Sequence, residues 1–398
     1  MSYRESIERL VQELPIKEGT FLITGATGLI GTCIINTLVA ANEKGCSFII
    51  YALGRSKKRM VNKFGDTIIA IEQDICASLD DSIKYDYIIH CASNADPLSY
   101  ANQPAETILI NVLGSKNVLD YCKNNVKTRL LLTSSFEVYG WLEGVSVYNE
   151  NMSGIIDQTR IRNAYPESKR SCELLLRSYV NEYNVNAVIV RLPSVYGPTM
   201  LMSDSKAHAQ FIKKAVNREN IVLKSKGEQR RTYSYVIDIV SGLFKVLFSR
   251  ERGEIYNISN ENSIASIAEV ASVCAKIAGT NVIYQIPDAV ETQGFSCPQD
   301  CILDNTKLTA GHITSIFVVV GAFLDVFNIY DKIILKVGGG SLVPITSFGH
   351  LLIHGAMHES TINGFMGLKM GLLSLTAAGI TSAIIYSFIF ALIFKPKN

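Results

Sequence analysis

The chain has 398 residues, a length that usually divides into two or three structural units, and its formal net charge is +2. It has no long run of lysine and arginine, so nothing favours a partner with a phosphate backbone, and we expect no binding to nucleic acid. The nine cysteines are odd in number and scattered, which fits a protein of a reducing compartment. Their spacing is not that of a zinc site. The N-terminus carries Glu5, Glu8 and Glu13 where a signal peptide would need a basic and then an apolar stretch. We therefore expect translation to begin in the cytoplasm and no export.

Short apolar runs alternate with helical stretches in the first half of the chain, as in a parallel sheet covered on both faces. The runs are Phe21–Thr24, Phe48–Leu53, Ile68–Ile71, Tyr87–His90, Leu130–Thr133 and Ala187–Leu192, and the helical stretches include Leu29–Leu38, Ala105–Lys123 and Ser168–Tyr183. Beyond Tyr196 the elements become shorter and less regular. We therefore expect a doubly wound α/β Rossmann domain over residues 1–192 and a small, interleaved substrate lobe over 193–302.

A glycine-rich turn follows the first apolar run. The segment reads Thr24-Gly25-Ala26-Thr27-Gly28-Leu29-Ile30-Gly31, and its glycines lie where a strand turns into a helix. Such a turn lets backbone N–H groups approach a pyrophosphate at the positive end of the helix. Because a strand and a helix flank it, the segment predicts a dinucleotide site.

The end of the second strand indicates which dinucleotide is bound. An acidic residue there would accept hydrogen bonds from the ribose of NAD, but the strand continues into Leu53-Gly54-Arg55-Ser56-Lys57-Lys58-Arg59. This basic cluster could pair with the 2′-phosphate of NADP, or it could be a solvated loop. The pattern favours NADP over NAD. Farther along, Asp74-Ile75 suits an adenine contact, and His90-Cys91-Ala92-Ser93 ends the strand where a cofactor would cross the sheet edge.

Tyr165 and Lys169 are four residues apart and therefore share one face of a helix. An ammonium near a phenol favours the phenolate, so a tyrosine with an ordinary pKa near 10 could act as a base close to neutrality. Ser134-Ser135 ends an earlier strand, at the distance in the chain that would bring a hydroxyl beside the phenol. These residues predict acid–base chemistry at a hydroxyl group.

The glycine turn and the segments HCAS, SSFEVYG, YPESK and RLPSVYGP occur in the order and spacing of the NAD-dependent epimerase/dehydratase family. The chain resembles this family over about residues 18–310. The resemblance implies a Rossmann domain with a small sugar-nucleotide lobe, and it is compatible with a homodimer. It also implies a nucleotide-sugar substrate and transient oxidation at C4 of the sugar by bound NAD(P).

The resemblance also implies roles for individual residues. Tyr165 would take the proton of the sugar hydroxyl, Lys169 would lower the pKa of Tyr165 and bind the ribose, and Ser135 would hydrogen-bond the same hydroxyl. Arg231, in GEQRRTYSYVID, matches an arginine that grips the substrate diphosphate, a role suited to the planar fork of a guanidinium. The residues expected to contact the cofactor are Gly25, Thr27, Gly28, Leu29, Ile30, Gly31, Arg55, Asp74, Ile75, Ala92, Tyr165 and Lys169.

The reaction type depends on the residues that follow Ser135. The chain looks most like the UDP-glucuronate decarboxylase branch, in which a glutamate lies two residues after the catalytic hydroxyl, as Glu137 does here. The 4,6-dehydratase branch has an aspartic acid just before that glutamate, where this chain has Phe136, so dehydration is disfavoured. The decarboxylase branch usually has a small hydroxyl residue at that position. A 4-epimerase is therefore the main alternative.

From Ile313 onward charged residues become rare, and Gly371–Phe394 has none. A bilayer needs about 20 apolar residues per spanning helix, so this stretch predicts a transmembrane helix. Lys395 and Lys397 follow it and place the C-terminus in the cytoplasm. Because the enzyme half needs a cytosolic cofactor, we expect an even number of crossings, with Ile313–Tyr330 as the partner span.

Residues 303–398 resemble the stage V sporulation protein AE family, small membrane proteins linked to movement of calcium dipicolinate. The segments VPITSFG and TAAGITSAIIYSFIFALIFKPK carry this resemblance, and LDNTKLTA, Leu303–Ala310, fits both families. The alternative function is therefore a spore-membrane transport component fused to a vestigial or purely binding epimerase-like domain. His350, His354 and His358 have the spacing of one helix face, but nearby glycine and proline weigh against a metal site, and we predict none.

Overall fold

The computed structural model describes residues 2–285 and 300–308 and divides the chain into two compact units, Met1–Asn305 and Thr306–Asn398. The first unit is built on a seven-stranded parallel sheet with the order β3-β2-β1-β4-β5-β7-β11. Its strands are β1 (Glu18–Thr24), β2 (Ser47–Gly54), β3 (Ile69–Glu72), β4 (Tyr87–His90), β5 (Arg129–Ser135), β7 (Ala187–Leu192) and β11 (Ile255–Asn257). The first six strands confirm the prediction, and the order is that of a Rossmann sheet.

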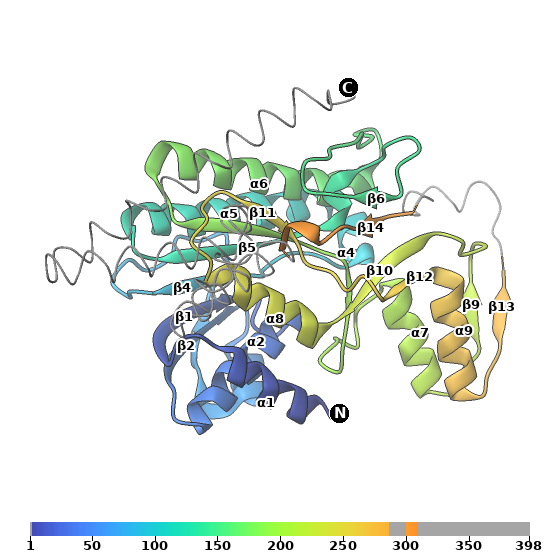
Figure 1. Cartoon of the computed structure of the whole chain (residues 1–398), viewed down its shortest axis with the longest axis horizontal. Coiled ribbons are helices and arrows are strands. Elements are labelled where there is room, and N and C mark those ends of the chain that lie inside the picture. The colour runs from blue at the N-terminus through green and yellow to red at the C-terminus, as the bar shows by residue number, and fades with distance from the viewer. Residues whose placement is uncertain (1, 286–299, 309–398) are drawn as a thin grey trace, which may run out of the picture. The chain divides into compact units, whose positions relative to one another are not determined.

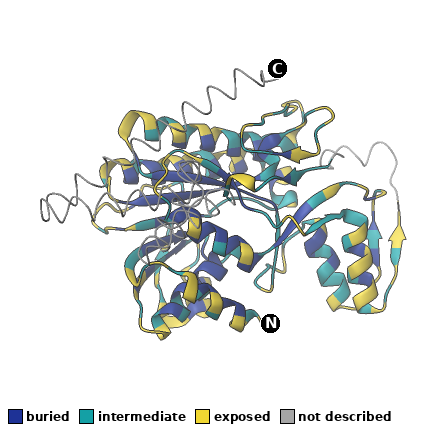
Figure 2. Cartoon of the chain, in the orientation of Figure 1, coloured by how far each residue is buried: buried dark blue, intermediate teal, exposed yellow. Residues whose placement is uncertain are grey.

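Helices cover both faces of this sheet (Figure 1). The two longest, α5 and α6, pack against each other on one face, and α1, α2 and α8 pack together on the other. The helices around the sheet are α1 (Tyr3–Glu13), α2 (Leu29–Glu43), α3 (Lys57–Phe64), α4 (Pro97–Asn102), α5 (Pro104–Asn124), α6 (Ala164–Tyr183) and α8 (Val236–Leu247). Strand β5 contacts both α6 and α8, and all seven of its residues are buried (Figure 2). The candidate residue at the end of β5 therefore stands on a fully buried strand with a helix packed on each face.

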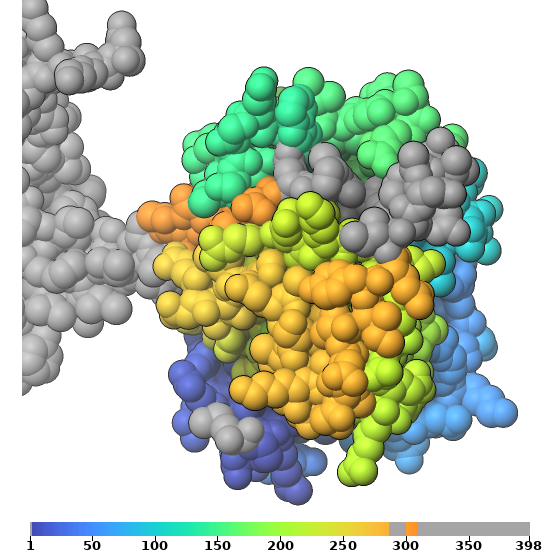
Figure 3. All heavy atoms as spheres, turned by 90° about the vertical axis from the view of Figure 1, so that its right-hand side faces the viewer, coloured from blue at the N-terminus to red at the C-terminus, as the bar shows by residue number. Residues whose placement is uncertain are grey.

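Part of the predicted substrate lobe packs around a core of its own. Helix α7 (Ala207–Val216) leads into β9 (Ile221–Leu223), and α9 (Ile267–Ala278) leads into β13 (Val282–Tyr284). The two strands pair in parallel, and their helices pack together around Phe211, Ala271 and Ala275. In Figure 3 the α7–β9 and α9–β13 segments lie next to each other on the face toward the viewer. Other parts of the predicted lobe, β11 and α8, belong to the Rossmann layers.

Two smaller sheets complete the first unit. A three-stranded sheet has the order β12-β10-β8, and a two-stranded sheet pairs β14 with β6. The bounds are β6 (Val147–Tyr148), β8 (Ser194–Tyr196), β10 (Arg230–Tyr235), β12 (Ile264–Ser266) and β14 (Ile302–Leu303), and three 3-10 turns are η1 (Gly65–Thr67), η2 (Phe136–Tyr139) and η3 (Ile161–Asn163). Leu303 is 2% exposed and packs with Tyr139 and Tyr148. Residues just before the second unit are therefore part of the core of the first.

The predicted membrane segments lie outside the described residues. Within residues 2–285 and 300–308, no helix combines the length and the apolar character that a membrane span requires. The predicted spans Ile313–Tyr330 and Gly371–Phe394 and the three histidines 350, 354 and 358 fall outside these ranges. The domain boundaries at residues 192 and 302 stay predictions.

Candidate active site

The glycine turn between β1 and α2 is shaped by close backbone contacts. Gly25 has a φ of +66°, and a methyl group on it would lie 2.8 Å from the backbone nitrogen of Ala92. A methyl group on Gly31 would lie 2.6 Å from the carbonyl oxygen of Gly25. Gly28 is the N-cap residue of α2 and supplies no side-chain cap, so the N–H groups at the start of the helix remain available to an anion. The arrangement fits the pyrophosphate of a dinucleotide, as the sequence predicts.

The basic segment after β2 forms helix α3, beside the glycine turn. Lys63 donates a hydrogen bond from Nζ to the carbonyl oxygen of Thr27, over 3.2 Å. Burial, and then the charge of Arg59, lower the pKa of Lys63. Arg55 directly follows Gly54, the last residue of β2, and its side chain is exposed. Lys63 therefore brings a cationic side chain of this segment next to the turn.

Strand ends β1 and β4 meet behind the turn. Thr24 Oγ1 and His90 Nδ1 are 2.8 Å apart, and Thr24 Oγ1 also accepts a hydrogen bond from the Ala92 N–H. Burial, and then the nearby charge of Lys169, lower the pKa of His90 to about 3, so its imidazole is neutral near pH 7. The predicted adenine-contacting residue Ile75 is buried against α5, where Gly114 leaves room for its side chain. These contacts fix the segment that would follow the cofactor.

Ser135, Tyr165 and Lys169 come together where β5 ends and α6 begins. Their exposed fractions are 8%, 6% and 4%. Lys169 Nζ donates a hydrogen bond to the carbonyl oxygen of Thr133, over 3.0 Å. Burial raises the pKa of Tyr165 and Glu137 raises it further, whereas hydrogen bonds with Ser135 and Ser93 lower it. Burial also lowers the pKa of Lys169.

Glu137 belongs to a cluster that sequence reasoning did not find. Arg162 Nη2 donates hydrogen bonds to Glu137 Oε2, over 3.3 Å, and to the Tyr100 hydroxyl oxygen, over 3.1 Å. The Tyr100 hydroxyl donates to Glu137 Oε1, over 3.4 Å. The Tyr100 ring stacks on the Tyr165 ring, with centroids 5.1 Å apart and planes 18° apart. The cluster therefore places a carboxylate and a guanidinium beside the predicted base.

The two missed residues come from separate segments, Tyr100 from α4 and Arg162 from η3. Arg162 is three residues before Tyr165, one turn away if the helical spacing extends backward, and this spacing could have indicated it. No local pattern connects Tyr100 to the site, because its position depends on how the segment between β4 and α5 folds back.

Arg231 lies on β10, and its guanidinium carbon is 5.0 Å from the centre of the Phe136 ring. Phe136 directly precedes Glu137, so Arg231 approaches the same end of β5 from the small sheet. A guanidinium stacked on an aromatic ring keeps its in-plane donors available to phosphate oxygens. The predicted diphosphate contact stays a prediction.

Comparisons with known proteins agree with this geometry. Residues 21–259 match the model of the NAD dependent epimerase/dehydratase family, and residues 297–393 match that of the SpoVAC/SpoVAEB sporulation membrane protein family. UDP-glucuronic acid decarboxylase 6 of Arabidopsis thaliana is 32% identical over 260 residues, which are 64% of this chain and 74% of the relative. Two other decarboxylases of that plant are matched over 57% of their length.

Solved structures of 4-epimerases share the fold. UDP-glucose 4-epimerase of Thermotoga maritima, with UDP-glucose, has a TM-score of 0.63 at 21% identity and covers 73% of this chain and 91% of its own. UDP-glucuronic acid 4-epimerase of Bacillus cereus, with UDP-glucuronic acid and NAD, has a TM-score of 0.61 at 21% identity over 73% and 92% of the two chains. By the family match over residues 21–259 and the 32% identity to a decarboxylase, this chain belongs to the NAD dependent epimerase/dehydratase family.

Proposed function

We propose that the first unit transiently oxidises the 4-hydroxyl of a nucleotide sugar, and that the sugar is a uronate that loses its carboxylate as CO2. The observation that carries this proposal is the cluster of Glu137, Arg162 and Tyr100 beside Tyr165. A guanidinium at that position suits a substrate with a carboxylate on the carbon beyond C5. The 32% identity to a UDP-glucuronic acid decarboxylase supports UDP-glucuronate as the substrate.

The residues of the chain divide the chemistry among them. When bound, the nicotinamide ring supplies the redox chemistry, by accepting a hydride from the sugar and returning it. Tyr165 takes the hydroxyl proton, with the Lys169 ammonium favouring its phenolate form and Ser135 orienting the oxygen. After oxidation, the C5–C6 bond breaks, its electron pair moves toward the C4 oxygen, CO2 leaves and a proton arrives at C5. Tyr165 and Ser135 would stabilise the developing charge on that oxygen, and Glu137 would act at C5 and C6.

Product analysis tests the reaction type. The full-length chain is incubated with UDP-glucuronate and either NAD or NADP in deuterated water, and the nucleotide products are separated by chromatography against epimer standards and identified by mass. Decarboxylation yields a UDP-pentose that carries deuterium at C5. A 4-epimerase, the second candidate, is favoured by Phe136, which departs from the small hydroxyl residue usual in decarboxylases. It would yield an epimer of unchanged mass without solvent deuterium, and this result would refute decarboxylation.

We also propose that the site prefers NADP over NAD, because it can bind the 2′-phosphate on the adenosine ribose of NADP. Arg55 follows β2 in place of an acid, and the cationic helix α3 lies against the glycine turn through Lys63. The structural neighbour from Bacillus cereus contains NAD, which makes the preference a point of difference from that protein. Dissociation constants of the two dinucleotides, measured by fluorescence of their reduced forms, test it.

The second unit is proposed to tether the enzyme to a membrane, with both termini in the cytoplasm. The match of residues 297–393 to a sporulation membrane protein supports this proposal. The assembled set of Ser135, Tyr165 and Lys169 weighs against a vestigial enzyme domain in a transport component. Carbonate extraction of membranes and reporter fusions at residue 398 and near Glu359 test the tether. A chain that extraction releases into the soluble fraction, or an external C-terminus, would contradict it.

A further inference from the structure

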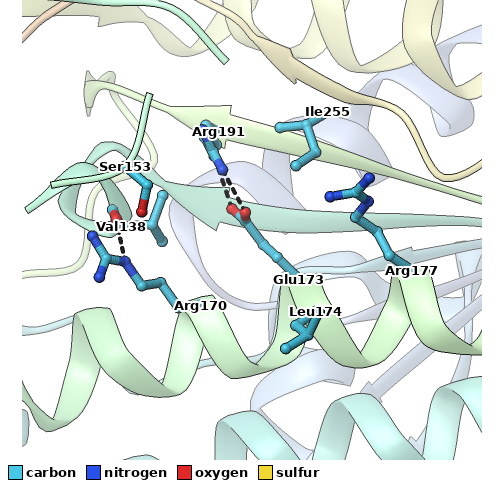
Figure 4. Close-up of a pocket in the computed structure, with 8 residues that line it drawn as sticks. All are labelled: Val138, Ser153, Arg170, Glu173, Leu174, Arg177, Arg191 and Ile255. Carbon is cyan, nitrogen blue, oxygen red and sulfur yellow. Dashed lines mark hydrogen bonds and ion pairs between the residues drawn. The ribbon is translucent and has the colours of Figure 1, made fainter. Parts of the chain in front are cut away.

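A buried ion pair lies behind the catalytic candidates. Glu173 is two turns after Tyr165 and one turn after Lys169, so the three residues share one face of α6. Arg191, on β7, donates two hydrogen bonds to the Glu173 carboxylate, from Nε over 3.1 Å and from Nη2 over 2.7 Å (Figure 4). The Glu173 and Arg191 side chains are 7% and 9% exposed. The pair is thus removed from water yet closely connected to the catalytic helix.

The same carboxylate holds the end of β5. Ser134 Oγ donates a hydrogen bond to Glu173 Oε1, over 2.6 Å, and Ser134 is also the residue of β5 that pairs with Arg191 of β7. One residue earlier, Thr133 accepts the hydrogen bond from Lys169. The strand end that carries Ser135 is therefore attached to α6 at two consecutive residues. Glu173 joins β5, β7 and α6 at a single point.

Stability alone does not account for this pair. Desolvating two charges costs several kcal/mol per ion, and apolar side chains of similar volume are often equally stable or better. A half-open pocket of about 210 Å³ lies beside the pair and is lined in part by Arg170, Arg177 and Leu174 (Figure 4). A buried charge retained where an apolar residue would fit indicates a role in positioning or in electrostatics.

The charges around Lys169 indicate which role. The titratable groups near Lys169 are His90 at the end of β4, Cys91 directly after it, and Cys172 and Glu173 from α6 itself, with Tyr165 one turn earlier on that helix. Burial lowers the pKa of His90 to about 3 and raises that of Cys91 to about 12, so both are neutral near pH 7. Burial also raises the pKa of Tyr165 and of Cys172. Among these groups, Glu173 bears the negative charge, one helical turn after Lys169, whose Nζ is hydrogen-bonded to Thr133 rather than to the carboxylate.

We propose that Glu173, held by Arg191, is a positioning residue for the reaction: it fixes Ser135 through Ser134, and its negative charge, one helical turn from Lys169, favours the ammonium form of that lysine. This inference rests on the proposed function, since it assumes that Ser135, Tyr165 and Lys169 act on a sugar hydroxyl. Without the carboxylate, the pKa of Lys169 falls. Because the ammonium is the active form, activity is then lost at a lower pH on the alkaline side of the profile.

Three variants of the full-length chain test the inference. Glu173→Gln removes the charge and keeps the shape, and Glu173→Leu combined with Arg191→Met removes both charges, so that no unpaired ion stays buried if the single variant unfolds. Glu167→Gln is the matched control, because Glu167 lies on the same helix in a partly exposed pair with Arg170. For each variant, thermal unfolding, cofactor affinity, kcat, KM and the pH profile of kcat are measured.

We expect folded Glu173 variants to lose at least tenfold in kcat, with KM and cofactor affinity within about twofold of the parent, consistent with effects seen at acid–base groups. The alkaline limb should move to lower pH in Glu173→Gln, and Glu167→Gln should match the parent. A folded double variant with parental kcat and pH profile overturns the inference while the proposed function stands. A parent that converts no nucleotide sugar overturns the proposed function, and the inference with it.

Discussion

The two halves of the candidate active site are built on different principles. The glycine turn presents backbone groups, and Gly25 and Gly31 matter there because any side chain would collide with neighbouring backbone. The hydroxyl-handling half depends on buried side chains from β5, α4, η3 and α6. A backbone site can be specified by eight consecutive residues, whereas a side-chain site needs the whole sheet to bring its parts together. The two halves should therefore fail in different ways when they are altered.

Tyr165→Phe is expected to give the largest difference between the two halves, a large loss of turnover with little change in cofactor binding. Positioned acid–base groups contribute about 10²–10⁴-fold, so turnover should fall by about that factor. Cofactor affinity should remain nearly parental, because the glycine turn is untouched. Steady-state rates and dinucleotide binding check this, with Tyr183→Phe at the far end of α6 as the control. Turnover within about threefold of the parent would end the proposed role of Tyr165.

Glu137→Gln should separate two steps within the hydroxyl-handling half, oxidation of the sugar and the later formation of product. Glu137 lies two residues beyond Ser135, and its carboxylate is held by Arg162 and Tyr100 rather than by the residues that serve oxidation. Product formation should slow by about tenfold or more, while transient reduction of the cofactor persists, in line with general acid–base effects. Stopped-flow absorbance of the reduced nicotinamide and product assays measure the two steps. An equal loss in both would make Glu137 a structural residue.

Leu303→Ala tests how far the side-chain half extends along the chain. Leu303 packs with Tyr139, which closes the turn after Ser135, and a buried leucine-to-alanine change costs about 2–5 kcal/mol. Thermal unfolding should show this loss, and Val126→Ala, at a position 61% exposed, should show almost none. Equal stability of the two variants would place residue 303 outside the enzyme core.

The smallest effect is expected at the rim of the backbone half. Arg55 is exposed, so Arg55→Ala should weaken NADP binding by a few fold through loss of one screened charge and leave NAD binding unchanged. Titration of both dinucleotides at low and moderate salt measures the change. If NAD weakens as much as NADP, the basic segment is only a solvated loop.

The contrast between the halves also explains what could be predicted. Strand β1 and the start of α2 follow from consecutive residues, as does the pairing of Tyr165 with Lys169 on one helix face. Strand β11 is three residues long and joins β7 from a distant part of the chain, so periodicity could not assign it to the large sheet. Tyr100 and Glu173 acquire their partners only through tertiary packing. Local patterns specify elements, but not which side chains will meet.

The late position of β14 has a consequence for biosynthesis. Its partner β6 is made about 155 residues earlier, so the core around Tyr139 and Tyr148 stays incomplete until residue 303 has been added. Chains grow at about 5–20 residues per second, so residues 306–398 alone take about 5–20 s to add. The catalytic unit can then close while residues 306–398 are still being synthesised. Folding of the first unit can therefore precede completion of the second.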